Sequence, residues 1–148
     1  MRRSIRLFCV LALGAASSMT AAYADDKDVI DYRQHVMNSL NEQTAALGQI
    51  LSTAIPDDQV VAHLEDIALI ASTALKAFEP KVQGGEAKPE VWAHWDDFSK
   101  RMNDFAQKTA AAAKTAKAGG KDEVLTNILD ALSCKSCHDV YRDEKKKQ

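Results

Sequence analysis

The sequence predicts an all-α protein folded as an antiparallel, up-down four-helix bundle. Four segments repeat apolar residues every three or four positions, which is the period of a helix with one buried face. No segment shows the strict alternation of apolar and polar residues that is typical of a half-buried strand. The connections between three of the four helices are short, and such connections favour antiparallel neighbours.

The first two helices are separated by Pro56. The first is predicted over residues 26–54, with an inward stripe of Ile30, Arg33, Met37, Leu40, Thr44, Leu47 and Leu51. The second opens at Asp57, a good N-cap residue, and stops at Pro80. Its inward stripe consists of Val60, Leu64, Ile67, Ala68, Ala71, Leu75 and Phe78.

The longest irregular connection is predicted over residues 79–88, because EPKVQGGEAK combines paired glycines with mixed charge. Pro89 suits the first turn of a third helix, which passes through an alanine-rich stretch and is predicted to stop at Gly119 and Gly120. Close packing or exposure would both fit those alanines. The inward residues are Val91, Trp92, Trp95, Phe98, Met102, Phe105 and Thr109.

The fourth helix is predicted to begin near Asp122 and to end before the charged tail RDEKKKQ. Its apolar residues are Val124, Leu125, Ile128, Leu129, Leu132, Val140 and Tyr141. A bundle of this kind offers its core as the place for a cofactor.

Residues 1–24 are predicted to be a secretory signal peptide. Three arginines precede an apolar run from Leu7 to Ala16, and small residues at Ala22 and Ala24 suit cleavage before Asp25. No later segment approaches the roughly 20 apolar residues that a membrane-spanning helix needs. We therefore expect one periplasmic domain over residues 25–148, with no permanent membrane span.

The charge of the mature chain is acidic. The leader carries three of the 19 basic residues and none of the 21 acidic ones, so its removal makes the formal net charge more negative than −2. This balance argues against nucleic acid or an anionic membrane as a partner.

Only Cys134 and Cys137 remain after cleavage, in a compartment that would oxidise free thiols. A disulfide, a zinc site or a thioether link to haem could occupy them. The string CKSCH, which ends at His138, is the attachment pattern of c-type haem. Cysteines three apart share one helix face, and the following imidazole can bind iron as the proximal ligand. A structural zinc site would need a second ligand pair, and a thioredoxin-like motif would need an α/β pattern. The sequence therefore predicts one covalent haem c inside the bundle.

Three segments resemble the class II c-type cytochromes, the family of cytochrome c′ and cytochrome c-556. They are YRQHVM at 32–37, FEPKVQGGEAKPEVW at 78–92 and CKSCHDVYR at 134–142. The late position of the haem motif is also typical of this class, and the resemblance spans the whole mature chain. It implies a homodimer whose haem lies in the bundle with one edge partly exposed.

The resemblance also assigns residues around the haem. Met37 matches the position facing the distal side of the iron, either as a sixth ligand or as a pocket residue. Arg33 and Gln34 match positions near the propionates, although an arginine extending to solvent at the bundle end is an alternative. Glu90 matches a position near the haem edge, where free amides of a helix start could receive a propionate.

Other residues are less strongly indicated as neighbours of the haem. Arg142 resembles a proximal-side arginine, but a cation at a helix C-terminus explains it almost as well. His35, His63 and His94 are alternative sixth ligands, and none shares the inward stripe as cleanly as Met37.

Two functions remain open at this stage. A methionine sixth ligand would suit an electron carrier with redox partner proteins. A vacant distal position would suit binding of nitric oxide or another small gas. An enzyme such as a peroxidase is not expected, because Met37 and its neighbours Val36 and Leu40 offer no polar group to help break an O–O bond.

Overall fold

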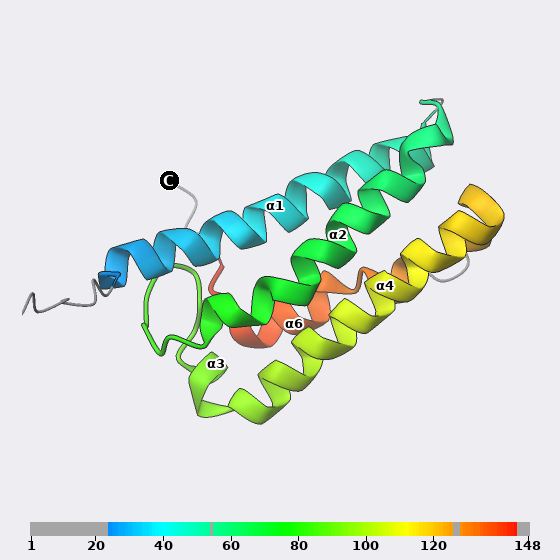
Figure 1. Cartoon of the computed structure of the whole chain (residues 1–148). Helices are drawn as coiled ribbons and strands as arrows, with labels where there is room; N and C mark the ends of the chain where they lie inside the picture. The colour runs from blue at the N-terminus through cyan, green and yellow to red at the C-terminus, as the bar shows by residue number, and fades with distance from the viewer. Residues whose placement is uncertain (1–23, 54, 126–127, 145–148) are drawn as a thin grey trace, which may run out of the picture.

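The computed structural model describes residues 24–53, 55–125 and 128–144, and these form the predicted all-α bundle (Figure 1). The predicted leader, apart from Ala24, lies outside the described residues. Within the described ranges, no helix has the length and apolar character needed to cross a membrane.

The first two limbs of the bundle lie side by side and run in opposite directions (Figure 1). Helix α1 (Asp26–Ser52) is capped by Asp25, whose carboxylate accepts a 2.8 Å hydrogen bond from the backbone N–H of Asp28. The second limb consists of a 3₁₀ turn, η1 (Asp57–Gln59), then α2 (Val60–Ala74) and a second 3₁₀ turn, η2 (Leu75–Phe78). Helix α2 packs extensively against both α1 and α4.

The third limb differs from the prediction at both ends. It divides into α3 (Glu90–Ala93) and α4 (Trp95–Leu125), because His94 leaves the helical conformation with φ −120° and ψ 47°. Helix α4 does not stop at Gly119 but continues through Leu125. Glycine weakens a helix by about 1 kcal/mol, and burial of Val124, which is 1% exposed, offsets that loss.

The fourth limb is correspondingly shorter than predicted. It contains α5 (Ile128–Ala131) and α6 (Cys134–Tyr141), separated at Ser133. Ser133 has φ −72° and ψ 55°, and the backbone N–H of Cys134 donates to the carbonyl of Leu132 at 2.7 Å, which is the geometry of an inverse γ-turn. Three of the apolar residues named for the predicted fourth helix are exposed: Leu125, Leu129 and Val140.

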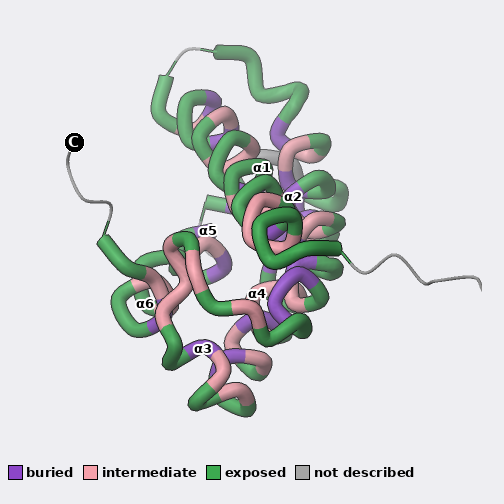
Figure 2. Tube along the Cα trace, turned by 90° about the vertical axis from the view of Figure 1, so that its left-hand side faces the viewer, coloured by how far each residue is buried: buried purple, intermediate pink, exposed green. Residues whose placement is uncertain are grey.

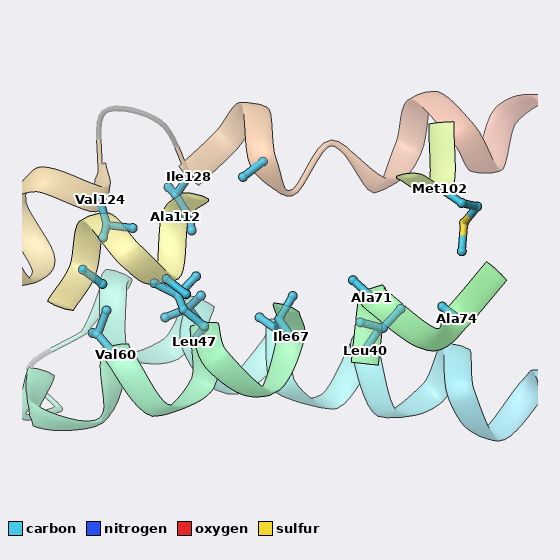
Figure 3. Close-up of a cluster of buried hydrophobic side chains, with 14 of the residues drawn as sticks. Leu40, Leu47, Val60, Ile67, Ala71, Ala74, Met102, Ala112, Val124 and Ile128 are labelled. Atoms are coloured by element: carbon cyan, nitrogen blue, oxygen red, sulfur yellow. The ribbon is translucent and has the colours of Figure 1, made fainter. Parts of the chain in front are cut away.

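The core lies along the middle of the bundle, where α1, α2, α4 and α5 face one another (Figure 3). In Figure 2, the stretches of the tube that mark buried residues lie on these inward faces, and exposed residues cover the outside. Fully buried residues such as Leu47, Leu64 and Ile67 each contribute about 1.5–3 kcal/mol by leaving water. The alanine-rich stretch of α4 follows both expectations, because Ala112, Ala113 and Ala116 are buried while Ala110, Ala111 and Ala118 are exposed.

Candidate functional site

Helix α6 presents the CKSCH motif at its first turn. Cys134 is exposed, Cys137 is half-buried, and both are free thiols rather than a disulfide. Burial raises the pKa of both thiols, and the nearby positive charge of Arg101 partly opposes this effect at Cys137. The two sulfurs are three residues apart on one helix, as attachment along one edge of a porphyrin requires.

His138 follows the second cysteine and is half-buried. Burial lowers its pKa, and the positive charge of Arg142 lowers it further. Both effects favour the neutral imidazole, which is the form that binds a metal. Arg142 is itself held by Glu86, whose carboxylate oxygen accepts from the arginine Nε at 2.7 Å.

Arg33 is the most unusual buried side chain in the described part of the chain. It is only 3% exposed, although it carries a positive charge. One guanidinium nitrogen donates to the carbonyl of Val82 at 2.8 Å, and the group lies 5.1 Å from the ring centre of Phe78 and 4.9 Å from that of Trp92. Its Nε and Nη1 have no hydrogen-bond partner.

Such an arrangement fits an anionic group that the chain does not supply. Leaving a buried donor unpaired costs about 1–3 kcal/mol. Burial accordingly lowers the pKa of Arg33, because the charged form is poorly solvated. A carboxylate would satisfy the two unpaired nitrogens through charge-assisted hydrogen bonds. The residues present therefore fit a haem propionate.

The connection over residues 79–89 packs against α1 beside Arg33. Gly84 and Gly85 have φ values of 129° and 65°, which residues other than glycine rarely adopt. A Cβ at Gly84 would lie 2.8 Å from Ile30 Cδ1, and one at Gly85 would lie 3.0 Å from Gln34 Nε2. Both glycines are therefore required for the close approach of this connection to α1.

The same connection also binds the end of α6. The backbone N–H of Lys88 donates to the carbonyl of Tyr141 at 3.0 Å, and that of Asp143 donates to the carbonyl of Glu86 at 2.9 Å. The connection thus brings the Arg33 end of α1 and the last turn of α6 to the same end of the bundle (Figure 1). This is the placement that one porphyrin held by both elements would need.

The sequence model of the family described as cytochrome c′ matches residues 28–142. The chain belongs to the cytochrome c′ family. Cytochrome c′ of Alcaligenes xylosoxydans xylosoxydans is 28% identical over 126 residues, covering 83% of this chain and 99% of the relative. Cytochrome c′ of Rhodopseudomonas palustris is 35% identical over 127 residues, covering 80% of this chain and 84% of the relative.

Solved cytochrome c′ structures share the fold. A nitric oxide complex of a point variant from Alcaligenes xylosoxidans has a TM-score of 0.76 at 27% identity, covering 83% of this chain and all of that one. A carbon monoxide complex of another variant from the same source has a TM-score of 0.75 at 27% identity, covering the same shares of the two chains. The predicted four-helix fold and family are thereby confirmed.

Within this family frame, Met37 lies on α1 one turn beyond Arg33. It is half-buried and packs against the hydrophobic core. Gln34 is exposed and lies beside Gly85. The roles of Met37 and Gln34 at a cytochrome c′ haem stay predictions.

Glu90 is exposed and begins α3, which has only four residues. The next two backbone N–H groups already donate within the chain, that of Val91 to Lys88 and that of Trp92 to Pro89, both at 3.1 Å. A propionate would therefore compete with existing hydrogen bonds here, and the role of Glu90 stays a prediction.

The alternative histidine ligands occupy other places. His35 and His94 are exposed. His63 is half-buried, and its Nδ1 makes a 2.7 Å hydrogen bond with Gln43 Oε1. Among the residues predicted for the distal side, Met37 alone packs against the core on the Arg33 face of α1.

Sequence reasoning missed the two rings that enclose Arg33. Phe78 and Trp92 are joined by a 2.9 Å hydrogen bond from the indole Nε1 to the Phe78 carbonyl. Both stand at the ends of the FEPKVQGGEAKPEVW segment, so the resemblance marked the segment. Only the closure of the connection reveals that its two ends meet over Arg33.

Proposed function

We propose that this chain is an exported c-type cytochrome that carries one haem c and transfers electrons to or from protein partners. The cytochrome c′ family binds haem, and the CKSCH motif supplies Cys134 and Cys137 for two thioethers. The single observation that carries the proposal is the buried Arg33 with two unpaired nitrogens, at the end of the bundle where α6 terminates. When bound, the haem supplies one-electron chemistry through its iron.

The residues of this chain would divide the work of holding that group. His138 would provide the proximal nitrogen, kept neutral by burial and by Arg142. Arg33 would bind a propionate, with Gln34 beside it and Glu90 near the haem edge. Met37 would occupy the distal side and limit access of water.

A second function is favoured by the solved relatives. Cytochrome c prime structures from Alcaligenes xylosoxidans include complexes with nitric oxide and carbon monoxide. If Met37 is a pocket residue rather than a ligand, the iron here would also be open to small gases. A sharp low-spin ferrous absorption band would favour the electron carrier, and a broad high-spin band would favour gas binding.

The remaining proposals concern the setting of the protein. The predicted leader at residues 1–24 supports export to the periplasm and cleavage before Asp25. Family membership supports a homodimer and redox partner proteins. Size-exclusion chromatography with light scattering would test the dimer.

The test of the proposed function is covalent haem attachment. The full chain is expressed with its leader in a host that makes c-type cytochromes, and the periplasmic product is analysed by intact mass spectrometry. We expect a chain starting at Asp25 with one haem added, resistant to acid–acetone extraction. The matched control is Cys137→Ala, which should lose attachment through that sulfur. A haem-free wild-type mass with a Cys134–Cys137 disulfide would overturn the proposal.

A further inference from the structure

A cluster of three side chains joins α6 to α4. The phenol O–H of Tyr141 donates to Asp97 Oδ2 at 2.5 Å, and Arg101 Nε donates to the same oxygen at 2.7 Å. The Arg101 guanidinium also lies 5.9 Å from the centre of the Tyr141 ring. Tyr141 is only 4% exposed, so its hydroxyl needs this partner.

The same cluster reaches the haem-binding motif. Arg101 Nη1 makes a long 3.5 Å hydrogen bond with the carbonyl of Ser136, which lies between the two cysteines. Arg101 is paired with Asp97 on α4, and the same Asp97 oxygen accepts from Tyr141 in the last turn of α6. A cation and a carboxylate on α4 therefore lie within electrostatic reach of α6 at its attachment site.

Aromatic rings also connect the cluster with Arg33. The ring of Tyr141 meets that of Phe98 edge-on at 5.2 Å, and Phe98 meets Phe78 at 4.9 Å. Phe78 in turn lies against Arg33. A chain of packed rings thus connects the last turn of α6 with the proposed propionate site.

Helix α6 depends on such contacts for its orientation. It has eight residues, and helices shorter than about 12 residues are marginal by themselves in water. Its first turn follows the γ-turn at Ser133 rather than a continuous helix. Contacts with α4 and with the connection over residues 79–89 must therefore set the direction of His138.

We infer that Asp97, Arg101 and Tyr141 are positioning residues that hold α6 against α4 and set the electrostatic potential at the haem-binding motif. This inference rests on the proposed function, because the tuned group is a haem at Cys134 and Cys137. A cation near the iron stabilises the reduced state, which has one positive charge fewer, and a carboxylate opposes this effect. Removing Arg101 should therefore lower the reduction potential, and neutralising Asp97 should raise it.

The test is a spectroelectrochemical titration of the holoprotein variants Asp97→Asn and Arg101→Gln at neutral pH. The matched controls are Asp104→Asn and Lys100→Gln, which break another ion pair between residues four apart in α4. In that pair, Lys100 Nζ lies 2.6 Å from Asp104 Oδ2. We expect potential shifts of opposite sign for the two cluster variants, each larger than that of its control. Arg101→Lys keeps the charge and should restore most of the wild-type potential.

The role of the cluster in holding α6 against α4 is measured separately with Tyr141→Phe, which keeps the ring packing and removes only the hydroxyl. Hydrogen exchange of the α6 amides should accelerate in this variant, while exchange in α2 stays at the wild-type rate. Shifts of the same sign for Asp97→Asn and Arg101→Gln, or unchanged α6 exchange, would overturn the inference. A wild type that lacks haem by mass would instead overturn the proposed function. Hydrogen exchange of the α6 amides in that haem-free chain would still test whether the cluster holds α6 against α4.

Discussion

The substitution Arg33→Met tests whether Arg33 anchors a haem propionate or makes contacts only within the chain. In the haem-free chain, the two unpaired nitrogens of Arg33 cost about 1–3 kcal/mol each. The hydrogen bond to Val82 contributes about 1.5–3 kcal/mol, and the two flanking rings together contribute about 1–2 kcal/mol. These opposing effects nearly cancel, so an apolar side chain of similar length should change the free energy of unfolding by only about 1 kcal/mol.

The holoprotein should respond differently to Arg33→Met. If a propionate pairs with the guanidinium, removing one partner of a buried ion pair costs about 3–5 kcal/mol. Urea unfolding followed by circular dichroism would measure both forms, with the haem-free reference made by replacing Cys134 and Cys137 with serine. Arg33→Lys, which keeps the charge but loses the planar fork, should lie between wild type and Arg33→Met in the holoprotein.

Equal losses in the haem-free and haem-loaded proteins would refute the reasoning, because they would show that Arg33 acts only within the chain. The reduction potential gives a second measurement that needs no haem-free protein. Losing a cation beside the haem should lower the potential of Arg33→Met relative to Arg33→Lys. Equal potentials for the two variants would likewise contradict a propionate anchor.

Three further predictions concern separate parts of the protein. If Met37 is an iron ligand, Met37→Ala should change a low-spin optical spectrum to a five-coordinate one. If it is a pocket residue, the substitution should make carbon monoxide binding faster. An unchanged spectrum together with an unchanged binding rate would exclude Met37 from the site. Gly85→Ala should destabilise the protein by about 1 kcal/mol or more, because a Cβ is strained at a φ of 65° and would lie too close to its neighbours. As a control, Gly48→Ala in α1 has open space around the new Cβ and should stabilise the protein by about 0.5–1 kcal/mol in thermal melts. Equal effects of the two substitutions would contradict this prediction. Hydrogen bonds from Tyr141 and then Arg101 lower the pKa of Asp97 below its ordinary 3.8, so the stabilisation is present above pH 3.8 and is lost as the pH falls through the folded pKa. The stability difference between wild type and Asp97→Asn should therefore shrink in acid unfolding below that pH, and a constant difference would contradict the linkage.

Much of the fold could be predicted because its signals are local. The stripes at spacings of three and four lie on residues that later proved buried in α1 and α2, including Leu40, Leu47 and Leu64. The glycines at 119 and 120 misled the prediction, because single-residue helix propensity carries no information about the burial of Val124 one turn later. The break at Ser133 was equally hidden, since it depends on a backbone turn rather than on an apolar pattern.

The sequence by itself determined the helical limbs, the family resemblance and the haem motif, because CKSCH places its chemistry on five consecutive residues. Only the tertiary structure decided which groups surround that motif. Arg33 meets Val82 across 49 positions, Tyr141 meets Asp97 across 44, and Arg142 meets Glu86 across 56. Such pairs depend on how loops close and helices pack, and the two unpaired nitrogens of Arg33 become informative only because packing removes them from water.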